Sequence, residues 1–113
     1  MQKITIWHHP RCSKSRKALE LLREKGIEPE IREYLKNPPT RTEIQKILDL
    51  LEKSPIEIVR QKEPEFSDFS KDDPDKKIID ALVKFPKLLE RPIVFSDQKA
   101  IIGRPPEKVL GFL

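Results

Sequence analysis

The chain has 113 residues, of which 36% are apolar and 37% are charged, so we expect one compact domain over residues 1–113 with a highly charged surface. No apolar run approaches the roughly 20 residues that a membrane-spanning helix needs, so no membrane partner is expected. The net charge of +4 comes from 23 basic and 19 acidic residues that are interleaved along the chain. This mixture indicates a solvated surface and argues against a nucleic-acid partner.

Cysteine usage and the N-terminal residues indicate a reducing compartment. Cys12 is the only cysteine, so no disulfide can form within the chain. Residues 1–6 lead directly into a strand-like pattern and lack the apolar segment and cleavage site of a secretory signal. We therefore expect a cytoplasmic protein.

The first forty residues predict a strand, a helix and a second strand. Residues 4–7 are rich in β-forming side chains, and a proline follows them. After Cys12, apolar residues recur at helical spacing until Gly26, which predicts a helix that begins near the cysteine and ends before the glycine. Residues 30–35 alternate in polarity like a strand and end at an Asn-Pro-Pro sequence. This order of elements predicts a parallel βαβ unit.

The middle of the chain predicts a helical insertion. Thr40 and Glu43 have the spacing of a capping box at the start of an amphipathic helix. A short helix is expected over residues 56–60, and the polar, proline-containing residues 61–75 are expected to form a loop. Asp75 is then expected to cap a further helix.

The end of the chain predicts a β-hairpin and a last helix. Residues 93–95 and 100–102 are apolar and flank a polar turn, which is typical of an antiparallel hairpin. Pro105 or Pro106 suits the first turn of the helix that follows. The predicted fold class is therefore α/β, with a thioredoxin-like, mixed four-stranded sheet flanked by helices and a helical insertion between its βαβ and ββα halves.

Cys12 stands between the end of a predicted strand and the start of a predicted helix. Unpaired N–H groups and the dipole at a helix N-terminus favour a thiolate over a thiol, and Arg11, Lys14 and Arg16 add positive charge nearby. The same N–H groups can hold an oxyanion. This combination favours a reactive nucleophile over the alternative of a buried, inert cysteine.

Three neighbours of Cys12 are candidates for supporting roles. Ser15 occupies the position of the second cysteine in a Cys-x-x-Cys motif, so a redox cycle would need a thiol from another molecule. The alternative for Ser15 is a solvated serine in the first helical turn. His8 and His9 make a poor zinc set with Cys12 at this spacing, so we expect no metal site. Supporting roles for His8, in tuning Cys12, and for Arg16 are favoured instead.

Five segments of the chain resemble the glutaredoxin-dependent arsenate reductases, also called the ArsC family. They are residues 8–16, 34–39, 59–64, 90–94 and 103–105, and they follow one another in the family's order over nearly the whole chain. The chain departs from the common pattern of the family at His9 and at Ser13 and Lys14, beside the nucleophile.

The resemblance implies that Cys12 attacks arsenate and that Arg60, Arg91 and Arg104 bind the oxyanion. Guanidinium groups suit this task because their planar donors match the oxygens of a tetrahedral anion. Pro92 matches a cis-proline that precedes a strand in the family. The resemblance also implies glutathione as a co-substrate, glutaredoxin as a partner, arsenite as the product and no bound cofactor.

Two alternatives stay open. A relative with this fold and cysteine would act on another substrate, such as a glutathionylated protein or a small disulfide. The Spx-type transcription regulators share the fold and bind RNA polymerase, but they typically carry a Cys-x-x-Cys switch, which Ser15 interrupts. The arginines at positions 60, 91 and 104 also favour an anion site over a regulator.

Overall fold

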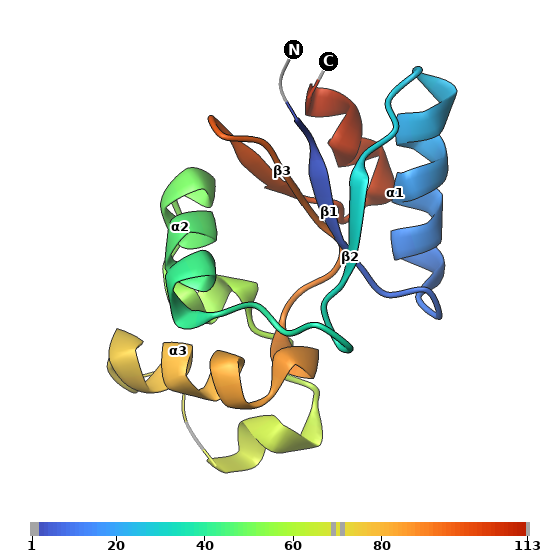
Figure 1. Cartoon of the computed structure of the whole chain (residues 1–113). Helices are drawn as coiled ribbons and strands as arrows, with labels where there is room; N and C mark the ends of the chain where they lie inside the picture. Colours follow the sequence, from blue (N-terminus) through green and yellow to red (C-terminus); the bar gives the residue numbers. More distant parts are fainter. Residues whose placement is uncertain (1–2, 69, 71, 113) are drawn as a thin grey trace. The chain divides into compact units, whose positions relative to one another are not determined.

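The computed structural model describes residues 3–68, 70 and 72–112 (Figure 1). The chain forms two compact units, of which the first combines Met1–Asn37 with Arg91–Leu113 and the second is Pro38–Glu90. The expected single domain over residues 1–113 stays a prediction. Within the described part of the chain, no helix is both long and apolar enough to cross a membrane.

The first unit contains a mixed sheet of four short strands. These are β1 (Thr5–His8), β2 (Glu30–Glu33), β3 (Ile93–Phe95) and β4 (Ala100–Ile102), in the order β2-β1-β3-β4. β1 pairs parallel with β2 and antiparallel with β3, and β3 pairs antiparallel with β4. The predicted βαβ unit, hairpin and thioredoxin-like sheet are confirmed.

Two helices pack side by side against this sheet (Figure 1). They are α1 (Ser13–Glu24) and η4 (Pro106–Phe112), and η4 is a 3-10 helix. Their contact with the sheet forms a core of six buried residues: Ile6, Ala18, Leu19, Leu22, Val94 and Val109. α1 ends as predicted before Gly26, whose φ of 79° suits a residue without a side chain.

β2 is shorter than the sequence predicts. The strand ends at Glu33 because the backbone N–H groups of Lys36 and Asn37 donate to the Glu33 carbonyl at 3.0 and 2.9 Å and turn the chain. Leu35, predicted to continue the strand, therefore lies in this turn with a 42% exposed side chain.

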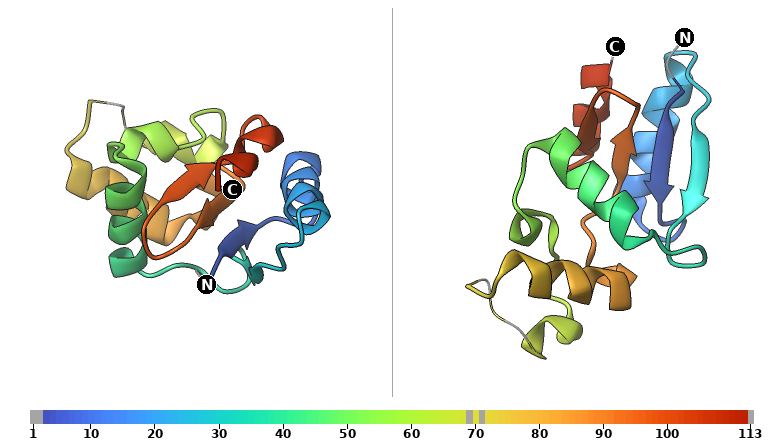
Figure 2. Two further views of the ribbon diagram at one scale, coloured as in Figure 1. Left: turned by 90° about the horizontal axis from the view of Figure 1, so that it is seen from above. Right: turned by 60° about the vertical axis from the view of Figure 1, so that its left-hand side comes forward.

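The second unit is helical. It contains α2 (Arg41–Leu51), η1 (Pro55–Ile58), η2 (Pro64–Asp68), α3 (Asp75–Lys84) and η3 (Pro86–Leu88). α2 and α3 pack against each other (Figure 2), and both bury isoleucine and leucine side chains. The insertion between β2 and β3 is therefore helical, as predicted.

The starts of α2 and α3 give one confirmation and one correction. The Thr40 hydroxyl accepts the Glu43 N–H at 3.2 Å and the Glu43 carboxylate accepts the Thr40 N–H at 2.8 Å, so the predicted capping box is present. Asp75 is not the cap of α3, because Pro74 occupies that position and Asp75 is the first helical residue. A carboxylate there still complements the partial positive charge of the helix start. The predicted loop over residues 61–75 also contains η2.

Candidate active site

Cys12 is the N-cap residue of α1. Its backbone is extended, with φ of −89° and ψ of 120°, and its carbonyl accepts the Arg16 N–H at 3.0 Å as the first bond of the helix. The Cys12 N–H donates to the His9 carbonyl at 3.0 Å, which closes a turn between β1 and α1. The thiol is partly exposed, so it is not the buried, inert side chain of the alternative interpretation.

The sulfur lies among donors that favour its anionic form. Partial burial raises the pKa of the Cys12 thiol, but the N–H of Ser15, the guanidinium of Arg91 and the N–H of Lys14 together lower it more, so the pKa lies below its ordinary value. The Arg91 guanidinium is held cationic in turn, because its contacts with Cys12 and Tyr34 raise its pKa against the effect of burial. Donors that stabilise a thiolate can also stabilise the oxygens of an anion next to it.

We expect the alkylation of Cys12 by iodoacetamide to reach its half-maximal rate below pH of about 8.5, the value of a free thiol. Arg91→Ala should raise this midpoint, because it removes a hydrogen bond and a positive charge from the thiolate. Arg23→Ala is the matched control, since that guanidinium is paired with Glu28 at 2.9 Å. A wild-type midpoint at or above the free-thiol value would contradict the prediction.

Ser15 connects the helix to the end of β1. Its side chain is fully buried, its Oγ lies 2.6 Å from His8 Nδ1, and the same oxygen accepts the His9 N–H at 3.0 Å. Burial lowers the pKa of His8 more than the Glu33 carboxylate raises it, so the imidazole is neutral near pH 7. The alternative of a solvated Ser15 is therefore wrong. Its hydroxyl holds the residues before Cys12, and the tuning of Cys12 by His8 stays a prediction.

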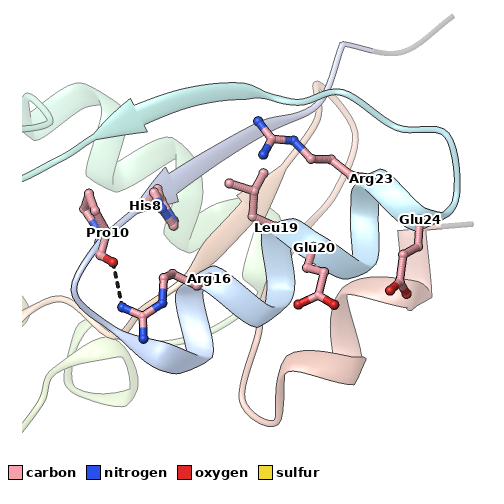
Figure 3. A pocket seen from close by; sticks show the side chains of 7 residues that line it. All are labelled: His8, Pro10, Arg16, Leu19, Glu20, Arg23 and Glu24. Carbon is pink, nitrogen blue, oxygen red and sulfur yellow. Dashed lines mark hydrogen bonds between the residues drawn. The ribbon is translucent and has the colours of Figure 1, made fainter.

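Arg16 binds the loop between β1 and α1. Its Nη1 donates to the Pro10 carbonyl at 2.9 Å, as the dashed line in Figure 3 shows. The two residues belong to the wall of an open groove of about 600 Å³. Along α1 in this view, Arg23 projects from one side of the helix, whereas Glu20 and Glu24 project from the other. The Arg16 guanidinium thus binds the backbone of the loop that precedes Cys12.

Arg91 and Arg104 flank the paired ends of β3 and β4. Ile93 and Ile102 are register partners, and the Arg104 Nε donates to the Arg91 carbonyl at 2.9 Å. The Arg91–Pro92 peptide bond is cis, as the resemblance implies, and the Arg104–Pro105 bond is also cis. Arg91 therefore contacts both Cys12 and Arg104, so the three residues lie in one place.

Arg60 belongs to the second unit. Its Nε donates to the Glu63 carboxylate at 3.3 Å, and both side chains are about one-fifth exposed. Its backbone N–H donates to the Leu88 carbonyl. The predicted role of Arg60 in binding the oxyanion stays a prediction.

A second open pocket of about 810 Å³ lies beside the loop that precedes Cys12. Residues 8–11 form one part of its wall, and Glu33, Leu35, Lys36 and Arg91 form the rest. Sequence reasoning missed Glu33 and Lys36, although they lie at or beside residues 34–39, which match the family. Across the described residues, no group of three or more histidine, cysteine, aspartate or glutamate side chains could hold a metal ion.

Comparisons with known proteins agree with this geometry. The sequence profile of the ArsC family matches residues 7–112. The protein YfgD of Escherichia coli K12 is 44% identical over 113 residues, with 96% of this chain and 95% of the relative covered. The arsenate reductase of Neisseria meningitidis serogroup A is 40% identical over 117 residues, with both chains fully covered. The solved structure of the arsenate reductase from Vibrio cholerae superposes with a TM-score of 0.93 at 35% identity, covering 99% of this chain and 98% of that one. The chain belongs to the ArsC family.

Proposed function

We propose that this chain is an arsenate reductase that uses the Cys12 thiolate as its nucleophile, glutathione as its co-substrate and glutaredoxin as its partner. The observation that carries the proposal is the set of donors at the Cys12 sulfur, which combines two helical N–H groups with the Arg91 guanidinium. Family relatives that are named arsenate reductase support the choice of substrate.

The first step joins the nucleophile to arsenic. The Cys12 thiolate attacks arsenate, an As–S bond forms, and one oxygen leaves as water after protonation. Arsenic stays in the +5 state at this point, so no electrons have been transferred. The Arg91 guanidinium is suited to balance the charge of the arsenate oxygens, since charge-assisted hydrogen bonds are stronger than neutral ones.

The reduction requires two further thiols. Glutathione displaces a second oxygen as water and forms another As–S bond. The glutaredoxin thiolate then attacks the glutathione sulfur, a disulfide forms between them, and the electron pair of the broken bond reduces arsenic to the +3 state. Water finally releases arsenite and frees Cys12. The cytoplasm supplies reduced thiols of this kind, and no bound cofactor takes part.

The direct test is arsenite formation from arsenate in the presence of glutathione and glutaredoxin. We expect sustained turnover by the wild-type protein and none by Cys12→Ser, with circular dichroism showing that the variant stays folded. If the wild-type protein leaves arsenate unchanged but reduces a glutathionylated protein or a small disulfide, the proposal is wrong and the alternative substrate class replaces it.

We expect Arg91→Ala, Arg104→Ala and Arg60→Ala each to weaken the binding of arsenate or sulfate at least about ten-fold, measured by calorimetry. Each substitution removes a charged hydrogen-bond donor, and such bonds contribute about 1.5–3 kcal/mol. Arg23 is exposed and paired with Glu28, so the Arg23→Ala variant should bind the anions as the wild type does. An unchanged affinity for any of the three would remove that arginine from the oxyanion site.

A further inference from the structure

The proposed reaction needs a thiol from outside the chain. Cys12 is the only cysteine, so the bond between its sulfur and arsenic must be reached by a sulfur of another molecule. A place where that molecule binds should adjoin Cys12 and should exceed the size of the oxyanion. This inference rests on the proposed function and concerns where the co-substrate binds.

The pocket of about 810 Å³ meets both conditions. Arg91 belongs to its wall and also hydrogen-bonds the Cys12 sulfur, so one side chain connects the pocket to the nucleophile. The volume is in the range of sites for small organic ligands and is far larger than a tetrahedral anion requires. An arsenate beside Cys12 would therefore leave most of the pocket open to a second molecule.

The charges of the wall indicate the chemistry of that molecule. Arg11, Lys36 and Arg91 are cationic, whereas Glu33 is the one carboxylate among the wall residues. The Lys36 Nζ lies 3.5 Å from the Glu33 Oε1. Because the lysine side chain is 80% exposed, this ion pair is weak, and each side chain can bind a ligand instead. Leu35, 42% exposed, adds an apolar contact. This set suits a ligand with more carboxylates than ammonium groups.

We propose that this pocket binds the co-substrate as a thiol peptide with two carboxylates and one ammonium group, the charges of glutathione. The carboxylates pair with Arg11 and Lys36, and the ammonium pairs with Glu33. The thiol then lies toward Arg91 and the arsenic on Cys12. Its sulfur displaces an oxygen of the arsenic adduct as water, and the electrons for the later reduction come from the two external thiols.

The groove in Figure 3 is a less suitable site for the same ligand. Its two guanidinium groups already have partners, since Arg16 donates to the Pro10 carbonyl and Arg23 pairs with Glu28. Glu20 and Glu24 also belong to its wall and would repel carboxylates. The two pockets therefore make different predictions for the residues that a ligand perturbs.

Binding can be tested without any thiol chemistry by titrating S-methylglutathione into the wild-type protein and recording backbone amide signals. We expect the largest shifts at His9, Arg11 and residues 33–36. Lys36→Glu should raise the dissociation constant about five-fold or more, because it replaces an attraction by a repulsion. Lys25→Glu, an equal charge change at an exposed residue after α1, should leave the constant within two-fold of the wild type.

Kinetics provide the second measurement. Lys36→Glu should raise the KM for glutathione about five-fold and leave the KM for arsenate unchanged. The pocket assignment would be wrong if the shifts were confined to the α1 residues of the groove in Figure 3. It would also be wrong if no binding occurred at millimolar concentration, even if arsenate is reduced. Conversely, the expected binding without arsenate turnover would support the pocket and refute the proposed function.

Discussion

Arsenate mixed with the protein alone is expected to give no sustained release of arsenite, and addition of glutathione and glutaredoxin should start turnover. Reduction of arsenic from +5 to +3 requires two electrons and ends with a disulfide. The chain has one thiol, so it can form the adduct but cannot form a disulfide within itself. The rate should therefore fall to background whenever the external thiols are omitted.

Mass spectrometry during turnover should detect glutathione joined to the arsenic adduct of Cys12. Ser15→Cys provides a complementary variant, because position 15 lies one helical turn from Cys12 and a second thiol there can form an internal disulfide. Its need for glutathione should be relaxed, and its free thiols should disappear as arsenite forms. Sustained wild-type turnover without any added thiol would contradict the proposed chemistry.

Gly103→Val is expected to destabilise the protein by about 3 kcal/mol and to weaken oxyanion binding. A Cβ at this position would lie 2.9 Å from the Pro92 ring and 3.1 Å from the Val109 side chain, and all three residues are buried. The Pro92 ring cannot rotate away, so either the core expands or the backbone beside Arg91 moves. Urea unfolding would measure the free energy of unfolding, and sulfate calorimetry would measure the loss of anion affinity expected if Arg91 moves.

Gly111→Ala is the matched control for this substitution. A Cβ at Gly111 would lie 3.5 Å from the Ile101 side chain, which is an ordinary contact, so its effect on stability should be close to zero. If Gly103→Val is as stable as Gly111→Ala, the close packing of Gly103 against Pro92 does not constrain the site.

Most of the fold could be predicted because it depends on local patterns. The apolar spacing of α1, the β-forming side chains of β1 and the capping box at Thr40 each depend on residues a few positions apart. The predictions of β2 and of the loop over residues 61–75 were wrong because backbone hydrogen bonds, and not side-chain patterns, determine these two segments. β2 ends at Glu33 because two following N–H groups bind its carbonyl, and η2 forms inside a polar segment that has no apolar periodicity.

The site was predictable where it depends on the start of one helix. The position of Cys12 before α1 predicts N–H donors at its sulfur, and the N–H groups of Ser15 and Lys14 do lower the pKa of the thiol. The spacing of the residues in α1 also indicates that Ser15 is buried, since Ser15 lies on the same face of the helix as Ala18, Leu19 and Leu22. The contact between Arg91 and Cys12, in contrast, joins positions far apart in sequence, and no local pattern encodes it.

The donors around the Cys12 sulfur also determine whether phosphate competes with arsenate inside a cell. Two backbone N–H groups and a guanidinium are suited to negative charge and tetrahedral oxygens, and these properties are common to arsenate and phosphate. Discrimination must then arise after binding, since thiols reduce arsenic but do not reduce phosphorus. Phosphate is therefore expected to occupy the site without reacting, so the arsenate concentration that half-saturates the protein should rise in proportion to the phosphate around it.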